Sequence, residues 1–302
     1  MNSKKKILLI SCTGQVGAEL WRGLQPLGEV VPADQNLTTV TRLDLTNPQQ
    51  IRELIQQVKP NIIVNAAAYT AVDKAEQDQH ITMAVNATAP QILADLAKQN
   101  DALLVHYSTD YVFDGIKRTP YLETDTPNPL NMYGKSKLAG DQAIQASGCN
   151  HLIFRTSWVY GLYGQNFLLT IQRLAKEREE LRIVADQIGS PTWSRLIADM
   201  TAQVLSQLYS PRFKKENFSD ISGISGIYNL TCGGQTNWCE FAQRISERAP
   251  KPPRVIPIPT ADYPAPAKRP LYSVLSNEKL AQTFGLELPN WDDALNICLS
   301  RS

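Results

Sequence analysis

The chain has 302 residues, 43% of them hydrophobic and 20% charged, which is enough to bury a substantial core in one large or two fused domains. Its 30 basic and 29 acidic residues give a formal charge of +1, so no overall field favours nucleic acid or an anionic membrane. The five cysteines form no close pairs of the kind found in zinc or thioredoxin-like sites, and the three histidines are scattered. We therefore expect reduced thiols in a cytoplasmic protein without a catalytic metal.

The first apolar run, residues 7–10, follows three lysines. A secretory leader needs roughly 7 to 15 apolar residues and a membrane span about 20, so we predict a buried strand here. The next segment, Ser11-Cys-Thr-Gly14-Gln-Val-Gly17, has glycines where a chain turning from a strand into a helix approaches a pyrophosphate. It indicates a dinucleotide loop, or else a plain strand-to-helix turn.

Two residues near this loop bear on the cofactor. Ser11 stands where the usual pattern has its first glycine, and its β-carbon is expected to crowd the cofactor and lower the affinity. Asp34 follows Gly14 by 20 residues, at the end of the expected second strand, where an acid bonds the ribose hydroxyls of NAD and repels the phosphate of NADP. The alternative is an aspartate that only shapes the turn before Asn36. We expect NADH to be at least tolerated.

Short apolar runs alternate with helical segments through the first half of the chain. Helices are predicted at residues 17–25, 49–58 and 131–147, between strands such as EVVPAD, NIIVNAAAY, ALLVHYST and HLIFRTS. This order predicts a Rossmann-type, doubly wound α/β fold whose parallel sheet is covered on both faces. We assign residues 1–155 to this NAD(P)-binding domain, with some later segments returning to it.

The second half has a different character and is predicted to form mainly a smaller, mixed α/β substrate-binding lobe, residues 156–302. Helices are expected at 167–178 and 194–208, a strand at LRIV, and an exposed loop at 210–226. The proline-rich residues 251–270 must run extended or turned.

The candidate catalytic residues are Tyr133, Lys137 and Thr109. Tyr133 and Lys137 are four apart, so on a helix their β-carbons lie roughly 5 to 6 Å apart. A cation about 5 Å away, at an effective dielectric near 20, contributes about 3 kcal/mol and is expected to lower the tyrosine pKa by roughly two units. A phenol so perturbed would exchange protons near neutrality. The same spacing also occurs on ordinary solvated helix faces.

Thr109 makes the catalytic interpretation stronger. It ends the strand ALLVHYST, and the carboxyl ends of parallel strands are where doubly wound sheets bind ligands. Thr109 would then face the same crevice as Tyr133, unless its hydroxyl only caps a turn.

Longer strings accompany these motifs, among them IIVNAAAYTAVDKAE, HYSTDYVFDG, LETDTPNPLNMYGKSKLAG, HLIFRTSWVYG and YPAPAKRP. Together they resemble the dTDP-4-dehydrorhamnose reductase family of extended short-chain dehydrogenases, in order and over nearly the whole chain. The resemblance implies that NADPH or NADH reduces the C4 ketone of dTDP-4-dehydro-6-deoxy-L-mannose, giving dTDP-L-rhamnose. It makes Tyr133 the proton donor, with Lys137 holding the nicotinamide ribose and Thr109 bonding the substrate oxygen.

The resemblance also implies the ligand contacts. On the cofactor it places Gly14, Gln15, Val16, Asp34, Asp44, Leu45, Ala68, Tyr69, Thr70, Tyr107, Tyr133 and Lys137, and on the substrate Thr109, Asp110 and Trp158. Two substrate contacts come from chemistry alone. Arg269 is a candidate clamp for the substrate pyrophosphate and Asn166 a candidate amide donor to it, unless both are surface residues.

Some members of the family bridge two subunits through Mg²⁺ held by glutamates. Glu19 matches the first such position, but Arg195 and Arg301 fall at the other two, and cations cannot replace anionic ligands. We expect no bound metal and no metal-bridged dimer, and hence a monomer or a weak homodimer.

Two other functions remain open from the sequence. One is a non-catalytic NADP-binding subunit like the regulatory subunit of methionine adenosyltransferase, and the other is a reductase or epimerase of another sugar nucleotide. Turnover of a sugar nucleotide would exclude the first, and the choice of hexose and base would decide the second.

Overall fold

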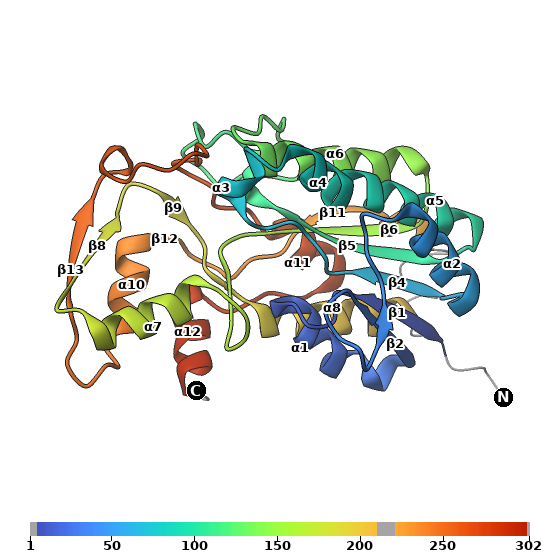
Figure 1. The fold of residues 1–302 in the computed structure, drawn as a ribbon, viewed down its shortest axis with the longest axis horizontal. Helices are drawn as coiled ribbons and strands as arrows, with labels where there is room; N and C mark the ends of the chain where they lie inside the picture. Colours follow the sequence, from blue (N-terminus) through green and yellow to red (C-terminus); the bar gives the residue numbers. More distant parts are fainter. Residues whose placement is uncertain (1–4, 210–220, 301–302) are drawn as a thin grey trace.

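A computed structural model describes residues 5–209 and 221–300. Its centre is a seven-stranded sheet in the order β11-β6-β5-β4-β1-β2-β3, with every neighbouring pair parallel (Figure 1). The chain runs from β1 to one edge and returns beside β1 as β4, which confirms the predicted doubly wound fold. The strands are β1 (Lys6–Ile10), β2 (Glu29–Asp34), β3 (Thr41–Arg42), β4 (Ile62–Asn65), β5 (Leu103–Thr109), β6 (His151–Thr156) and β11 (Gly226–Asn229).

Helices cover both faces of the sheet because its central strands are apolar on both sides (Figure 1). One face packs against α1 (Gln15–Gly23), α8 (Ser194–Tyr209) and α11 (Glu278–Phe284). The other packs against α2 (Pro48–Val58), α5 (Ala89–Gln99) and α6 (Met132–Ser147).

The smaller lobe lies beyond the carboxyl ends of the strands of the sheet, at the left of Figure 1. It contains the parallel pair β8 (Glu180–Val184) and β13 (Arg254–Ile258), with α7 (Phe167–Glu177), α10 (Trp238–Ser246) and α12 (Trp291–Leu299). Two short pairs complete it, β7 (Val159–Tyr160) with β10 (Thr192–Trp193), and β9 (Ile188–Gly189) with β12 (Thr236–Asn237). The lobe has its own core, which includes Tyr160, Leu181, Trp193, Phe241 and Leu295.

The predicted helices are found within about two residues of their expected ends, and LRIV lies in β8. The loop expected at 210–226 falls largely outside the described residues, and its last part is ordered differently, with a 3₁₀ turn at Ile221–Ile224 and the start of β11 at Gly226. The proline-rich segment supplies β13, which is extended as expected.

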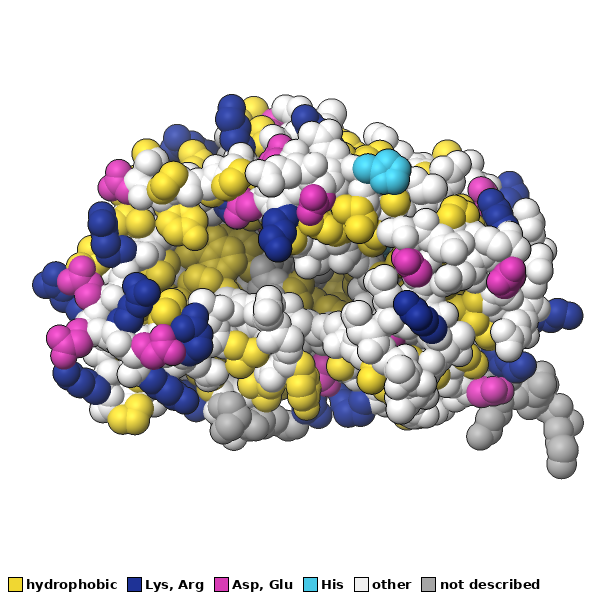
Figure 2. Space-filling view, in the orientation of Figure 1, with side chains coloured by type: hydrophobic (Ala, Val, Ile, Leu, Met, Phe, Trp, Pro, Cys, Tyr) yellow, Lys and Arg dark blue, Asp and Glu magenta, His cyan; other side chains and the backbone are white. Residues whose placement is uncertain are grey.

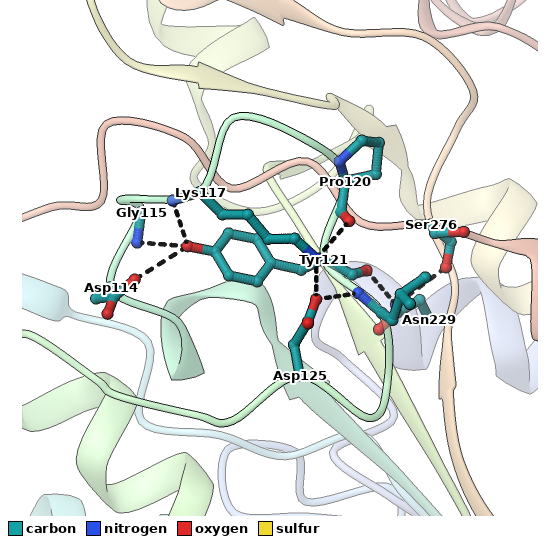
Figure 3. Close-up of polar contacts among 9 residues, drawn as sticks. Asp114, Gly115, Lys117, Pro120, Tyr121, Asp125, Asn229 and Ser276 are labelled. Carbon is teal, nitrogen blue, oxygen red and sulfur yellow. Dashed lines mark hydrogen bonds and ion pairs between the residues drawn. The ribbon is translucent and has the colours of Figure 1, made fainter.

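A long connection between β5 and α6 is tied to the C-terminal part of the chain (Figure 3). The hydroxyl of Tyr121 accepts the N–H groups of Gly115 and Lys117 and donates to Asp114, which closes the connection on itself. The side-chain amide of Asn229 on β11 donates to the carbonyls of Tyr121 and Ser276. These contacts hold the connection in place next to the carboxyl end of β5.

Candidate active site

The loop after β1 has the close geometry that a dinucleotide requires. A β-carbon on Gly17 would lie 1.8 Å from the carbonyl oxygen of Ser11, so only glycine fits there. Gly14 is the N-cap of α1 and brings no side-chain cap to the first N–H groups of that helix. Those N–H groups can donate hydrogen bonds to phosphate oxygens. Ser11 itself has φ +63°, a left-handed conformation that favours glycine.

Beside this loop is a cavity of about 470 Å³ at the carboxyl ends of β1, β2 and β4. Its lining includes six of the residues above, Ser11, Asp34, Asp44, Leu45, Ala68 and Tyr69. The carboxylate of Asp34 accepts the N–H and hydroxyl of Thr13 and the N–H of Asn36, so it shapes the turn as well as facing the cavity. Burial opposes ionisation of Asp34, but these hydrogen bonds outweigh it and lower its pKa.

The remaining cofactor candidates lie around this cavity in different settings. Val16 packs on the core beneath α1, while the side chain of Gln15 reaches the carbonyl of Gln165. The Tyr69 N–H donates to Asn86, which lies in a π-helical turn, Ala84–Thr88, and Thr70 is exposed next to it. Tyr107 points its hydroxyl to Thr201 on α8, so the part of Tyr107 nearest Lys137 is its backbone carbonyl.

Thr109 and Tyr133 come together at the carboxyl end of β5. Gly134 allows this approach, because a β-carbon there would lie 2.2 Å from the carbonyl oxygen of Tyr111. Tyr133 is partly exposed, yet desolvation of its hydroxyl raises the pKa to about 12, against the lowering effect of a hydrogen bond with Thr109. The ring of Tyr111 meets that of Tyr133 edge to face, with centroids 5.8 Å apart.

The expectation that Lys137 would bring the pKa of Tyr133 toward neutrality was wrong. Lys137 is 1% exposed and directs its side-chain nitrogen away to β5, where Nζ lies 2.6 Å from the carbonyl oxygen of Tyr107 and 3.0 Å from Nε2 of His106. Burial of the Tyr133 hydroxyl therefore dominates, and the phenol stays protonated at neutral pH.

A buried ion pair lies one helical turn beyond Lys137. Asp141 on α6 and Arg155 on β6 are 3.3 Å apart with side-chain exposures of 0% and 2%, and Ser108 donates to the same carboxylate. Sequence reasoning missed this pair because each residue alone looked like an ordinary charge on a helix or strand. The signal was Arg155 within the apolar strand HLIFRTS.

Asp110 follows Thr109 and is also buried, with 2% exposure. Burial raises its pKa to about 7, opposed by hydrogen bonds from Ser273 and Thr109. Ser273 belongs to the C-terminal segment, so this carboxyl lies where the sheet and that segment meet.

Trp158 lies at the start of the smaller lobe with φ +45°, stacked on Trp238 at a centroid distance of 3.6 Å. Next to Trp238 is a second cavity of about 220 Å³ lined by Phe167, Arg182, Ile183, Val184, Gln187, Trp238, Tyr263 and Arg269. A hollow with hydrophobic side chains along it is visible between the two parts of the molecule (Figure 2). Sequence reasoning missed Phe167, Gln187 and Trp238, because they come from separate elements without a shared motif.

The two residues proposed for the substrate pyrophosphate have different surroundings. Arg269 lines this second cavity and forms a two-pronged ion pair with Asp73, at 3.1 and 2.8 Å. Asn166 caps α7, because its side-chain oxygen accepts the N–H of Leu169, and its amide donates to the carbonyls of Gly161 and Tyr163. The Asn166 amide therefore already has hydrogen-bond partners in the protein, whereas the side chain of Arg269 still lines the cavity.

Within residues 5–209 and 221–300, no three histidine, cysteine, aspartate or glutamate side chains gather as metal ligands would. Glu19 pairs with Arg22, and Arg195 pairs with Asp199, while Arg301 lies outside the described residues. No helix in the described part of the chain is long and apolar enough to cross a membrane.

The comparisons with known proteins agree with one another. A family model described as "RmlD substrate binding domain" matches residues 5–302. The dTDP-4-dehydrorhamnose reductase of Burkholderia thailandensis is 47% identical over 302 residues, covering 97% of this chain and 98% of the relative. That of Escherichia coli K12 is 44% identical over 292 residues, covering 94% of each. The solved structure of the Bacillus anthracis enzyme in complex with NADP has a TM-score of 0.89 at 35% identity, covering 99% of this chain and 100% of that one.

Proposed function

The chain belongs to the dTDP-4-dehydrorhamnose reductase family, and on that premise we propose that it reduces dTDP-4-dehydro-6-deoxy-L-mannose to dTDP-L-rhamnose with NADH or NADPH. The observation that carries the proposal is the approach of Thr109 to Tyr133 at the carboxyl end of β5, with Lys137 buried against the same strand. This is the end of a doubly wound sheet at which ligands bind. The glycine loop and the cavity at the same end fit a dinucleotide.

When bound, the reduced nicotinamide supplies the hydride that the C4 carbon accepts. Tyr133 donates its phenolic proton to the C4 oxygen, and its high pKa keeps that proton available at neutral pH. Thr109 holds the phenol and the substrate oxygen together. Lys137 holds the cofactor ribose and, once charged, stabilises the phenolate that proton donation leaves behind.

On the cofactor side, residues 1–155 supply the contacts. The loop from Ser11 to Gly17 holds the pyrophosphate, and Asp34 and Asp44 face the adenosine ribose. Two carboxylates in this cavity can bond the ribose hydroxyls of NADH, so we expect NADH to be at least tolerated.

On the substrate side, residues 156–302 supply most of the surface. Trp158 contacts the sugar together with Thr109 and Asp110, and Arg269 binds the pyrophosphate. Asp73 holds the Arg269 guanidinium in place before the substrate arrives. Asn166 contributes by setting the start of α7 beside the cavity, and can contact the phosphate only by exchanging its present bonds.

We place the enzyme in the cytoplasm as a monomer or weak homodimer without a metal bridge. The five cysteines are free and buried, as in proteins of reducing compartments. Sedimentation with and without Mg²⁺ tests the assembly, and a dimer that forms only with magnesium would contradict it.

The direct test is consumption of NADH and NADPH by the purified protein with dTDP-4-dehydro-6-deoxy-L-mannose. We expect oxidation of the cofactor and formation of dTDP-L-rhamnose. No turnover, together with tight binding to a methionine adenosyltransferase, would favour the non-catalytic alternative. Turnover only with another hexose or base would favour a different sugar-nucleotide reductase.

Arg269 gives a second test in the same assay. Arg269→Ala should raise the KM for the sugar nucleotide more than it lowers kcat, because a ground-state phosphate contact is lost. Arg254→Ala is the matched control, since that arginine is exposed and pairs with Glu180 away from the cavity. An unchanged KM in Arg269→Ala would remove Arg269 from the site.

A further inference from the structure

A chain of three side chains leads from the interior of the sheet to the active-site lysine. Asn65 at the end of β4, His106 on β5 and Lys137 on α6 are 0%, 0% and 1% exposed. The Asn65 amide nitrogen lies 3.1 Å from Nδ1 of His106, and Nε2 of His106 lies 3.0 Å from Nζ of Lys137. All three side chains are buried, so each of their polar atoms must form its hydrogen bond with another of the three or with the backbone.

The backbone decides which way Asn65 faces. Its side-chain oxygen accepts the N–H of Ala67, at 3.2 Å, and a backbone N–H can only donate. The amide nitrogen of Asn65 must therefore point to His106 and donate to Nδ1. A neutral imidazole that accepts at Nδ1 carries its proton on Nε2, so His106 presents an N–H to Lys137.

An N–H facing Lys137 requires an acceptor, and an ammonium group has none. A neutral amine has one lone pair and two N–H bonds, so it can accept from His106 while donating to the carbonyl of Tyr107. We propose that Asn65 and His106 form a donor pair that selects the uncharged amine of Lys137 in the protein without bound ligands. Both are positioning residues, because they act on the reaction through Lys137.

Burial of Lys137 also favours the uncharged amine, whereas Asp141 favours the ammonium. Burial lowers the pKa of Lys137 to about 8, and Asp141 on the same helix opposes that shift. Asp141 is itself paired with Arg155 on β6, which limits how far its charge raises the pKa of Lys137. Asp110, from the turn that follows β5, acts on Tyr133. The inference rests on the proposed function for its purpose, because the pair would set the charge of Lys137 before that residue holds the cofactor ribose.

Nitrogen NMR on the ligand-free protein tests the donor pair without any assay of activity. The chain has only three histidines, and two of them make opposite predictions. His106 should carry its proton on Nε2, whereas His151 should carry it on Nδ1, which lies 2.9 Å from the carbonyl oxygen of Cys149. His80→Gln and His106→Gln assign the signals. A proton on Nδ1 of His106 would overturn the proposal.

Two variants test the effect on Lys137, whose Nζ signal is followed against pH and assigned with Lys137→Met. Asn65→Asp offers a carboxylate to Nδ1, moves the proton there, and turns Nε2 into an acceptor for an ammonium. His106→Gln removes the N–H donor without adding charge, because its amide can turn its oxygen to Lys137. Both should raise the proton affinity of Lys137 by about tenfold, equal to one pH unit.

Asn61→Asp is the matched control. It makes the same chemical change just before the other end of β4, where Asn61 accepts the N–H of Lys6, and it should leave Lys137 unchanged. If the midpoint of the Lys137 pH titration is unchanged in His106→Gln, the proposal is contradicted, even if Asn65→Asp proves unstable. Because these measurements need no substrate, a failure of the reductase assay would not affect their outcome.

Discussion

Replacing Ser11 by glycine should make the protein more stable. Ser11 holds φ +63° because its N–H donates to the carbonyl of Ala33 and its carbonyl accepts from Gly14, so the loop has no freedom to relax. A β-carbon in this conformation costs about 1–2 kcal/mol, and the greater freedom of glycine in the unfolded chain returns about 0.5–1 kcal/mol. The expected net gain is about 0.5–1 kcal/mol, or roughly 1–3 °C in Tm.

Thermal unfolding of Ser11→Gly, Ser11→Ala and the parent protein measures this gain. Ser11→Ala is the matched control, because alanine removes the hydroxyl but keeps the strained β-carbon, and it should not melt above the parent. Ser11→Gly should also bind NADH more tightly, as the crowding expected at this position would be relieved. Equal melting temperatures for the glycine and alanine variants would refute the reasoning.

Two further predictions concern the buried charges. Asp141→Asn should destabilise the protein by about 3–5 kcal/mol, because Arg155 would remain charged and buried without a partner, and replacing both residues by apolar ones should recover part of the loss in thermal unfolding. A loss below about 1 kcal/mol would mean that the pair is hydrated. Burial holds the pKa of His106 well below its ordinary value of 6.5. The unfolded chain therefore gains a proton there that the folded protein does not, so stability should fall by up to about 1.4 kcal/mol per pH unit below about pH 6.5, and His106→Gln should lack this slope.

Much of the fold could be predicted because its signals are local. Apolar runs such as ALLVHYST mark strands buried on both faces, and the caps of the helices stand in the sequence beside them, as Asn131 does before α6. The right-handed connections of parallel strands then leave only a few possible strand orders. The approach of Thr109 to Tyr133 could likewise be expected, since both belong to the end of one strand and the helix that follows it.

The electrostatics could not be predicted in the same way. The spacing of Tyr133 and Lys137 predicts their separation along a helix. It does not predict the direction in which the lysine side chain points or how deeply the phenol hydroxyl is buried. Those depend on His106 and on the carbonyl of Tyr107, which only the folded sheet brings near. The cavity beside Trp238 was missed for a similar reason, because its lining comes from α7, β8, α10 and the segment around Arg269.

The most direct test of the reductase mechanism is Tyr133→Phe, assayed for NADH oxidation with dTDP-4-dehydro-6-deoxy-L-mannose and for NADH binding by fluorescence. Phenylalanine keeps the ring against Tyr111 and removes only the proton donor. The mechanism predicts a loss of most of the turnover, of the order of 10²-fold or more, with NADH binding retained. A variant that still turns over at a rate near that of the parent protein would contradict it.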